Sequence, residues 1–145
     1  RELEKAVNAQ YDDCDALVMA AAVSDYRPAV RAENKIKKEQ HDHLNIELTE
    51  NPDILYGLAL DKAHQFLVGF AAETRDVIEY GKAKLAKKNL NLLVANDVAQ
   101  QGAGFNVSTN IAALIYKDGH IEQYLKMTKD DLGHIIIEKI AEGIN

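Results

Sequence analysis

Three apolar runs, each followed by polar residues, constrain the fold of this chain more than any other feature of its sequence. They span residues 16–22, 66–70 and 90–95. Their length and lack of alternation favour strands buried on both faces, as in parallel sheets covered by helices. Segments with helical signals, residues 51–62 and 75–88, separate the runs. This alternation with short connections predicts parallel strands joined by right-handed crossovers, and therefore an α/β fold with flanking helices.

The polar residues that follow the three runs should share one place in such a fold. Asp25 follows the first run, Glu73 the second and Asn96 the third. The carboxyl ends of parallel strands meet at one edge of the sheet, which is where open α/β folds bind ligands. A nucleotide site at that edge is the natural hypothesis.

The remaining segments predict further elements around this sheet. We expect a helix over residues 2–10, a loop over 24–34, a strand with one wet face over 44–49, and a hairpin of residues 110–116 and 121–125 around an Asp-Gly turn. Thr128 and Asp131 resemble a capping box for a final helix that ends near Gly143. The chain should therefore end in a β-hairpin and a helix.

Residues 51–53 form a strong signal for the start of the helix over residues 51–62. The amide of Asn51 can cap free N–H groups, Pro52 suits the first helical position, and the Asp53 carboxylate is stabilised by the helix dipole. The same free N–H groups can bind an anionic ligand. The residues alone are equally consistent with an ordinary helix cap and with a ligand site.

Composition narrows the classes of function. The chain has 145 residues, 47% of them hydrophobic, which suffices for one domain with a core. Its 17 basic and 23 acidic residues give a net charge of −6, which argues against a general nucleic-acid binder. No apolar stretch approaches the ~20 residues of a membrane span. The single cysteine, Cys14, excludes an intramolecular disulfide, so a reducing cytoplasm is the expected location.

Six short segments, taken in order, carry a more specific signal than any one of them alone. They are residues 20–28, 34–38, 51–54, 69–74, 95–98 and 104–106, which read AAAVSDYRP, NKIKK, NPDI, GFAAET, ANDV and GFN. Together they resemble the synthetase domain of bacterial phosphopantothenoylcysteine synthetase, a ligase of coenzyme A biosynthesis that is often fused to a decarboxylase. The resemblance implies a Rossmann-like, mostly parallel sheet in a single synthetase-type domain over residues 1–145, although the N-terminal strand and glycine-rich turn of that family have no counterpart here.

The resemblance also implies a reaction in two steps. The carboxylate of 4′-phosphopantothenate attacks the α-phosphate of CTP to give an acyl-cytidylate and pyrophosphate, and the amine of cysteine then displaces CMP. A divalent cation such as Mg²⁺ and a homodimer are implied, with FMN only in a fused decarboxylase domain. Because the missing opening of the domain holds an asparagine needed for catalysis, we expect residues 1–145 alone to bind CTP weakly and to form little product.

Lys35 is the candidate catalytic residue. It matches the catalytic lysine of the family, and a fixed ammonium would stabilise the charge that crowds around the phosphorus in the first step. The positions that the resemblance assigns to nucleotide binding are Met19, Ala20, Ala21, Asp25, Lys35, Asn51, Pro52, Asp53, Ile54, Phe70, Lys84 and Lys88. Asn96, Phe105 and Asn106 take supporting roles at the edge of the pocket, and the metal ligands are unknown.

Several of these residues also have an ordinary structural explanation. Lysines near a helix C-terminus stabilise it, an aspartate such as Asp25 can make a turn, and Phe70 can belong to the core. His41 and His43 only superficially suggest a metal site, and we expect them to be solvated near a flap over the pocket.

Two rival functions remain open. A dehydrogenase-like dinucleotide-binding fragment would explain the spacing of Tyr80 and Lys84, but the chain has no G-x-G-x-x-G turn. A noncatalytic interaction module would explain residues 44–49 and the terminal hairpin as surfaces that add to another sheet. Thermal stabilisation by CTP, by NADP or by neither would separate the three functions.

Overall fold

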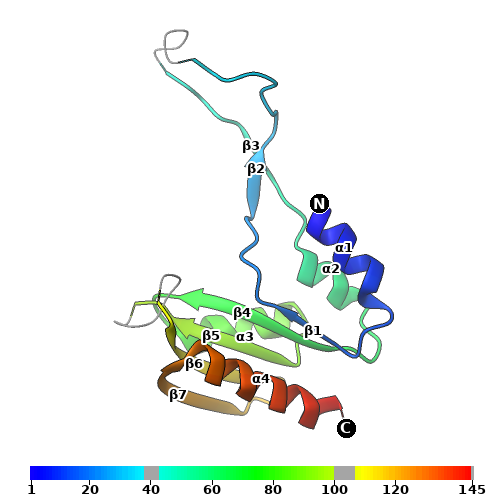
Figure 1. The fold of residues 1–145 in the computed structure, drawn as a ribbon, viewed down its shortest axis with the longest axis vertical. Helices are drawn as coiled ribbons and strands as arrows, with labels where there is room; N and C mark the ends of the chain where they lie inside the picture. Colours follow the sequence, from blue (N-terminus) through cyan, green and yellow to red (C-terminus); the bar gives the residue numbers. More distant parts are fainter. Residues whose placement is uncertain (38–42, 100–106, 145) are drawn as a thin grey trace.

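The computed structural model describes residues 1–37, 43–99 and 107–144, and has two parts, a layered body and an arm that projects from it (Figure 1). The body is built on a five-stranded sheet in the order β1-β4-β5-β6-β7. Its strands are β1 (Ala16–Met19), β4 (Phe66–Glu73), β5 (Leu92–Asp97), β6 (Thr109–Tyr116) and β7 (Ile121–Thr128). The helices of the body are α1 (Glu2–Tyr11), α2 (Ile54–Leu60), α3 (Val77–Lys87) and α4 (Lys129–Ile144).

The sheet is mixed, and four of its five strands run in the same direction. β1 pairs with β4 and β4 pairs with β5 in parallel, with Val18 opposite Val68 and Phe70 opposite Val94. β6 is antiparallel to both β5 and β7. Gly119 turns the hairpin at φ +91°, a conformation that favours glycine. The prediction of a mostly parallel sheet followed by a terminal hairpin and helix is confirmed.

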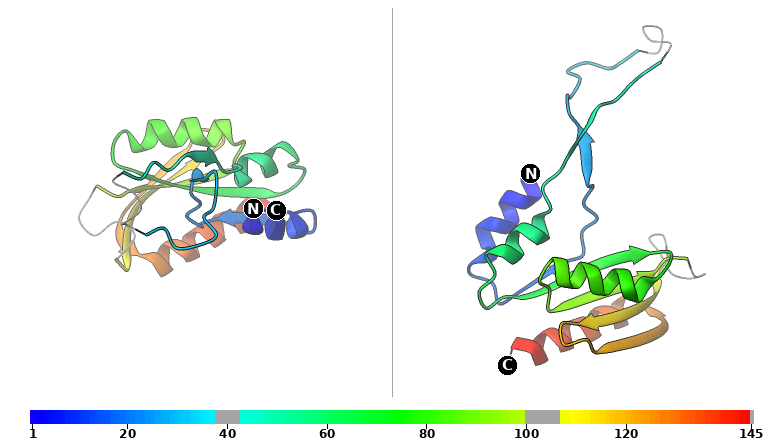
Figure 2. Two further views of the ribbon diagram at one scale, coloured as in Figure 1. Left: turned by 90° about the horizontal axis from the view of Figure 1, so that it is seen from above. Right: turned by 180° about the vertical axis from the view of Figure 1, so that it is seen from behind.

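Helices cover both faces of this sheet, as the view from above shows (Figure 2). On one face α2 and α3 pack over a core that includes Leu67, Leu93 and Ile115, and α1 adds Tyr11 to the same cluster. On the other face α4 packs over the cluster of Val68 and its neighbours. Adjacent residues of β4 therefore point to opposite faces, as the period of two requires. Within the described ranges, none of the helices is long and apolar enough to cross a membrane.

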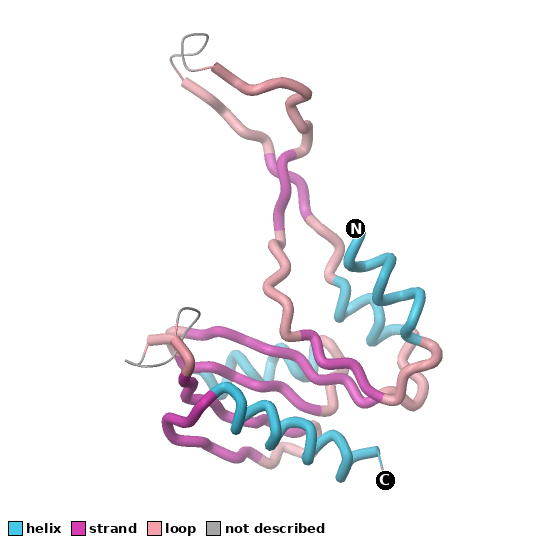
Figure 3. Tube along the Cα trace, in the orientation of Figure 1, coloured by secondary structure: helices cyan, strands magenta, loops and turns pink. Residues whose placement is uncertain are grey.

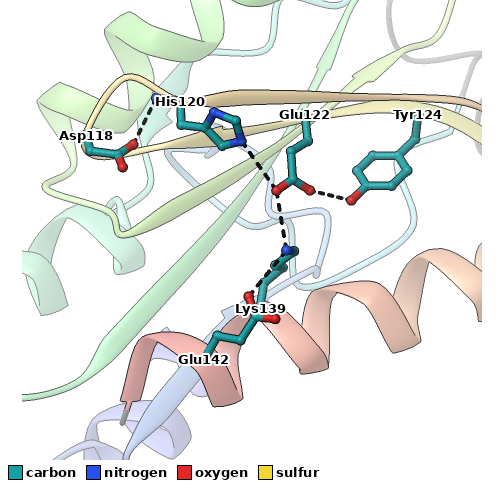
Figure 4. Close-up of polar contacts among 6 residues, drawn as sticks. All are labelled: Asp118, His120, Glu122, Tyr124, Lys139 and Glu142. Atoms are coloured by element: carbon teal, nitrogen blue, oxygen red, sulfur yellow. Dashed lines mark hydrogen bonds and ion pairs between the residues drawn. The ribbon is translucent and has the colours of Figure 1, made fainter.

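Polar contacts tie α4 to the terminal hairpin (Figure 4). Glu122 on β7 accepts a hydrogen bond from the hydroxyl of Tyr124 and lies 3.3 Å from the Lys139 ammonium on α4. His120 Nε2 lies 3.5 Å from the same carboxylate, and Lys139 also reaches Glu142 at 3.3 Å. The hydrogen bond from Tyr124, and then the contact with Lys139, hold the pKa of Glu122 below its ordinary value. Helix and hairpin thus form one unit.

The arm spans residues 26–50 and contains a separate two-stranded sheet. Its strands are β2 (Tyr26–Pro28) and β3 (Leu48–Glu50), which pair antiparallel with Arg27 opposite Thr49. No residue in either of these two strands is buried. The described parts of the arm project away from the body, as seen from the front and from behind (Figures 1 to 3). The two strands of the arm therefore contribute no buried residue to a hydrophobic core.

Some details of the predicted elements are wrong. Residues 24–34 are not wholly a loop, because β2 forms by pairing with β3, and the strand predicted over 44–49 is limited to β3. β1 is not buried on both faces: it is an edge strand in the described part of the chain, and Val18 is 37% exposed. β4 continues past residue 70 to Glu73, so Phe70 lies within the strand and not at its end.

Candidate functional site

A cavity of about 180 Å³, here called the main cavity, lies between the carboxyl end of β1 and the start of α2. Nine of the twelve residues predicted to bind nucleotide line it, namely Met19, Ala21, Asp25, Asn51, Pro52, Asp53, Ile54, Phe70 and Lys88. Val23, Ser24 and Leu55 complete the lining. Pockets for small molecules usually measure roughly 300 to 1,000 Å³. The main cavity alone therefore has room for only part of a nucleoside triphosphate.

Asp53 occupies the amino end of α2 at this cavity. Its side chain accepts a hydrogen bond from the backbone N–H of Tyr56 at 3.1 Å and caps the helix. The Lys88 ammonium lies 3.0 Å from Oδ2 and 3.1 Å from Oδ1 of the same carboxylate. The predictions that Asn51 caps this helix and that Pro52 is its first residue are wrong, because the carboxylate of Asp53, two positions beyond Asn51, accepts the hydrogen bond from the free N–H and the helix begins at Ile54.

Asn51 instead joins two segments of the cavity wall. Its side-chain N–H donates to the carbonyl of Ser24 at 2.8 Å, and its backbone N–H donates to the carbonyl of Asp25 at 2.7 Å. Its side-chain oxygen accepts from Arg27 Nη1 at 3.0 Å. The side chain of Asn51 is thus engaged on both sides by the protein itself.

Asp25 is the acidic side chain of the main cavity whose charge is not paired. Its carboxylate forms no ion pair or side-chain hydrogen bond with any described residue, in contrast to Asp53. Within the described ranges, no group of three or more His, Cys, Asp or Glu residues could hold a metal ion by itself. Mg²⁺ is often bound by one or two carboxylates together with substrate phosphates. The unpaired carboxylate of Asp25 could supply one oxygen ligand to such a cation.

The other three predicted residues lie outside the main cavity. Lys35 is exposed on the arm. Lys84 forms an ion pair with Glu73 at 2.6 Å and lines a separate cavity of about 250 Å³ beside Tyr80. Although Lys84 and Lys88 are four residues apart, they contact different carboxylates and line different cavities. Ala20 faces a further cavity.

This cavity beside Ala20, here called the second cavity, measures about 270 Å³ and lies on the α4 side of the carboxyl edge of the sheet. Its lining includes Ala20, Phe70 and Asn96, so Phe70 belongs to the walls of both cavities. Asn110, which is 6% exposed, donates from Nδ2 to Asn96 Oδ1 at 2.9 Å. The sequence analysis did not single out Asn110 as a residue of the site. The signal that could have indicated it is an amide side chain at the start of an otherwise apolar strand.

Some predicted positions cannot be placed. Phe105 and Asn106, and the residues from Lys38 to 42 with His41 among them, lie outside the described residues.

Fold and cavity together define an α/β protein of the Rossmann-like class with a candidate ligand site at the carboxyl edge of its sheet. A family model, "DNA/pantothenate metabolism flavoprotein C-terminal domain", matches residues 1–144, and the chain belongs to this family.

Similar proteins include bifunctional enzymes of coenzyme A biosynthesis. The chain is 44% identical over 140 residues to the "Coenzyme A biosynthesis bifunctional protein CoaBC" of Bacillus subtilis, covering 97% of this chain and 34% of that protein. It is 43% identical over 144 residues to the protein of the same name in Escherichia coli K12, covering 97% and 35%. The chain thus spans about a third of the length of these curated relatives.

Solved structures agree with the fold. The crystal structure of the C-terminal domain of a CoaBC protein superposes with a TM-score of 0.76 at 34% identity, covering 96% of this chain and 59% of that one. A DNA/pantothenate metabolism flavoprotein from Streptococcus pneumoniae gives a TM-score of 0.77 at 22% identity, covering 97% and 68%. The predicted family resemblance is confirmed by these matches.

Proposed function

We propose that this chain is the synthetase part of a ligase that joins 4′-phosphopantothenate and cysteine with CTP in coenzyme A biosynthesis. The observation that carries the proposal is the main cavity, where nine residues assigned to nucleotide binding meet at the carboxyl edge of the sheet. The names of the CoaBC relatives support the same pathway. Tyr80 and Lys84, the pair that favoured a dehydrogenase, line a different cavity and lend that alternative no support.

In the first step the main cavity would hold part of CTP. A carboxylate oxygen of phosphopantothenate forms a bond to the α-phosphorus, while the bond to the pyrophosphate oxygen breaks and pyrophosphate leaves with the electron pair. Lys35 would be brought from the arm to the crowded negative charge, where a fixed ammonium stabilises the transition state. Asp25 would hold a divalent cation, Mg²⁺ or another, which supplies charge neutralisation to the triphosphate when bound.

In the second step the acyl-cytidylate reacts with cysteine. The amine nitrogen forms a bond to the acyl carbon, the bond to the CMP oxygen breaks, and the amine loses a proton. Lys88 is held by Asp53 beside the cavity and would orient the phosphate of the intermediate. Cysteine is a substrate here, and Cys14 has a structural contact instead, because its Sγ donates to the carbonyl of Tyr11 at 3.2 Å.

The test is pyrophosphate release by the full-length protein. We expect release from CTP only when 4′-phosphopantothenate is present, and amide product only when cysteine is added as well. ATP in place of CTP and pantothenate without its phosphate are the matched controls. Release of pyrophosphate without any carboxylate substrate, or no release at all, would contradict the proposal.

We also propose a homodimer in which the terminal hairpin takes part. Leu125 on β7 is 87% exposed and borders an apolar cavity of about 300 Å³ that includes Val77, Ile78 and Ile111. The arm carries exposed Leu44, Ile46 and Leu48, the second candidate surface. Apolar faces of this kind favour a partner. A cytoplasmic location remains part of the proposal and is supported by the low cysteine content alone.

A further inference from the structure

Arg27 closes a ring of hydrogen bonds at the base of the arm. Its Nη1 donates to the backbone carbonyl of Glu50 and, at 3.0 Å, to the side-chain oxygen of Asn51. Asn51 in turn donates from Nδ2 to the carbonyl of Ser24 at 2.8 Å. One guanidinium thus connects the outgoing leg of the arm with the returning leg, and both legs with the wall of the main cavity.

This arrangement differs from that of an ordinary surface arginine. The bonds of Arg27 reach residues 23 and 24 positions away, and the side chain is half-buried between them. Neither acceptor is a carboxylate, so the contacts fix the geometry of the chain and do not serve to neutralise charge. Hydrogen bonds from a charged donor are stronger than those between neutral groups.

The arm needs such a fixed base because packing does not orient it. No residue of β2 or β3 is buried. Lys35 lies eight residues beyond Arg27 on the same leg, and eight extended residues span at most roughly 26 Å. At that reach a rotation of about 5° at the base moves the far end by up to about 2 Å. Displacements of about 1 Å are enough to lower a rate by about a hundredfold.

We propose that Arg27 is a positioning residue that holds the base of the arm and thereby fixes the direction in which the arm presents Lys35. This inference rests on the proposed function. Arg27 itself does not line the cavity and acts through Asn51 and through the direction of the arm.

The structural half of the inference is tested by amide hydrogen exchange on the full-length protein without ligands. Besides the pairing of β2 with β3, two backbone amides that join the legs of the arm serve as reporters: Ala29 donates to the carbonyl of Glu47 at 2.9 Å, and Asn51 donates to that of Asp25 at 2.7 Å. We expect Arg27→Met to speed exchange at both by on the order of tenfold. The amides of Phe66 and Asn91, which bond within the body, are the internal reference and should not change. Unchanged exchange at Ala29 and Asn51 would overturn the inference.

The functional half is tested by a double-mutant cycle on pyrophosphate release. We expect Arg27→Met to lower kcat by on the order of tenfold to a hundredfold and to change the KM for CTP less, because the lost contact acts in the transition state. In a Lys35→Gln background the same substitution should cost less than about threefold, because the group that Arg27 positions is already absent. Arg27→Lys keeps a charged donor and should give an intermediate kcat. Additive losses, or a change confined to KM, would overturn the positioning role.

The matched control is Arg75→Met. Arg75 is exposed on the loop before α3 and has no hydrogen bond or ion pair with the described residues. This variant should behave as wild type in both experiments, and an equal loss in it would also overturn the inference. A wild-type protein that releases no pyrophosphate would instead overturn the proposed function. Unchanged amide exchange in an active Arg27→Met variant would overturn only the positioning role of Arg27.

Discussion

Two antiparallel ribbons, β2–β3 and β6–β7, lie in the described part of the chain, and they are stabilised in different ways. The terminal hairpin of β6 and β7 has eight residues in each strand and contributes Leu114 and Ile115 to the core. The arm ribbon of β2 and β3 has three residues in each strand and buries none of them. An isolated two-stranded ribbon is marginal in water. The hairpin is therefore part of the folded body, whereas the arm depends on the hydrogen bonds of Arg27 and Asn51 at its base.

The largest expected effect concerns the stability of the two ribbons. Leu114→Ala removes a fully buried side chain from the hairpin and should lower the free energy of unfolding by about 3 kcal/mol. Leu48→Ala on the arm, where the side chain is 55% exposed, should change it by less than about 0.5 kcal/mol. Urea denaturation of both variants measures the difference. Equal losses would show that the arm is packed as firmly as the hairpin.

For turnover, unlike for stability, a substitution on the arm should have a large effect. Lys35→Gln on the arm should lower turnover by on the order of a hundredfold, the scale of one lost electrostatic contact to the transition state. Its free energy of unfolding should stay near that of wild type, because Lys35 is exposed. Lys37→Gln, on the same leg and also exposed, is a charge-matched comparison with a smaller expected loss. Unchanged turnover in Lys35→Gln would remove the catalytic assignment.

Association should distinguish the ribbons again. Leu125→Asp places a charge on the apolar surface of the hairpin and should weaken the proposed dimer by about tenfold or more. Lys126→Asp on the same strand changes charge without removing apolar area and is the control. Sedimentation at several concentrations measures the dissociation constant. A chain that sediments as a 16.1 kDa species at high micromolar concentration would contradict the dimer for residues 1–145.

The smallest expected effect lies in the polar contacts of the hairpin with α4. Tyr124→Phe removes the hydrogen bond to Glu122 and should cost about 1 kcal/mol at pH 7. Because the folded pKa of Glu122 is lowered from its ordinary 4.5, its stabilisation is present above that value and is lost as the pH falls through the folded pKa. The difference between wild type and variant should therefore shrink in acid, as thermal unfolding from pH 7 to pH 3 would measure. A difference that grows in acid would contradict this role.

The same contrast explains what the sequence could predict. The runs at residues 66–70 and 90–95 identify β4 and β5 because burial on both faces leaves a continuous apolar signal. The pairing of β2 with β3 leaves no such signal, since neither strand is buried and the contact between Arg27 and Asn51 at the end of the pair joins residues 24 positions apart. Pro28 favoured a loop on local grounds, and tertiary contacts decided otherwise.

The position of the candidate site could be predicted from the sequence, whereas the contacts of its individual side chains could not. The edge of the sheet and nine lining residues follow from strand direction and family resemblance. The partners of individual charges do not: Lys84 and Lys88 share a helical spacing, yet one pairs with Glu73 and the other with Asp53. The contacts of Arg27 were not predicted, because nothing in the sequence next to an arginine that precedes a proline indicates a contact with residues more than 20 positions away.

Phe70 belongs to the wall of the main cavity and of the second cavity. Any molecule that fills one cavity therefore touches a residue that also lines the other cavity. Two bound molecules, one in each cavity, would contact the same aromatic side chain. A substitution of Phe70 would therefore change the lining of both cavities at once.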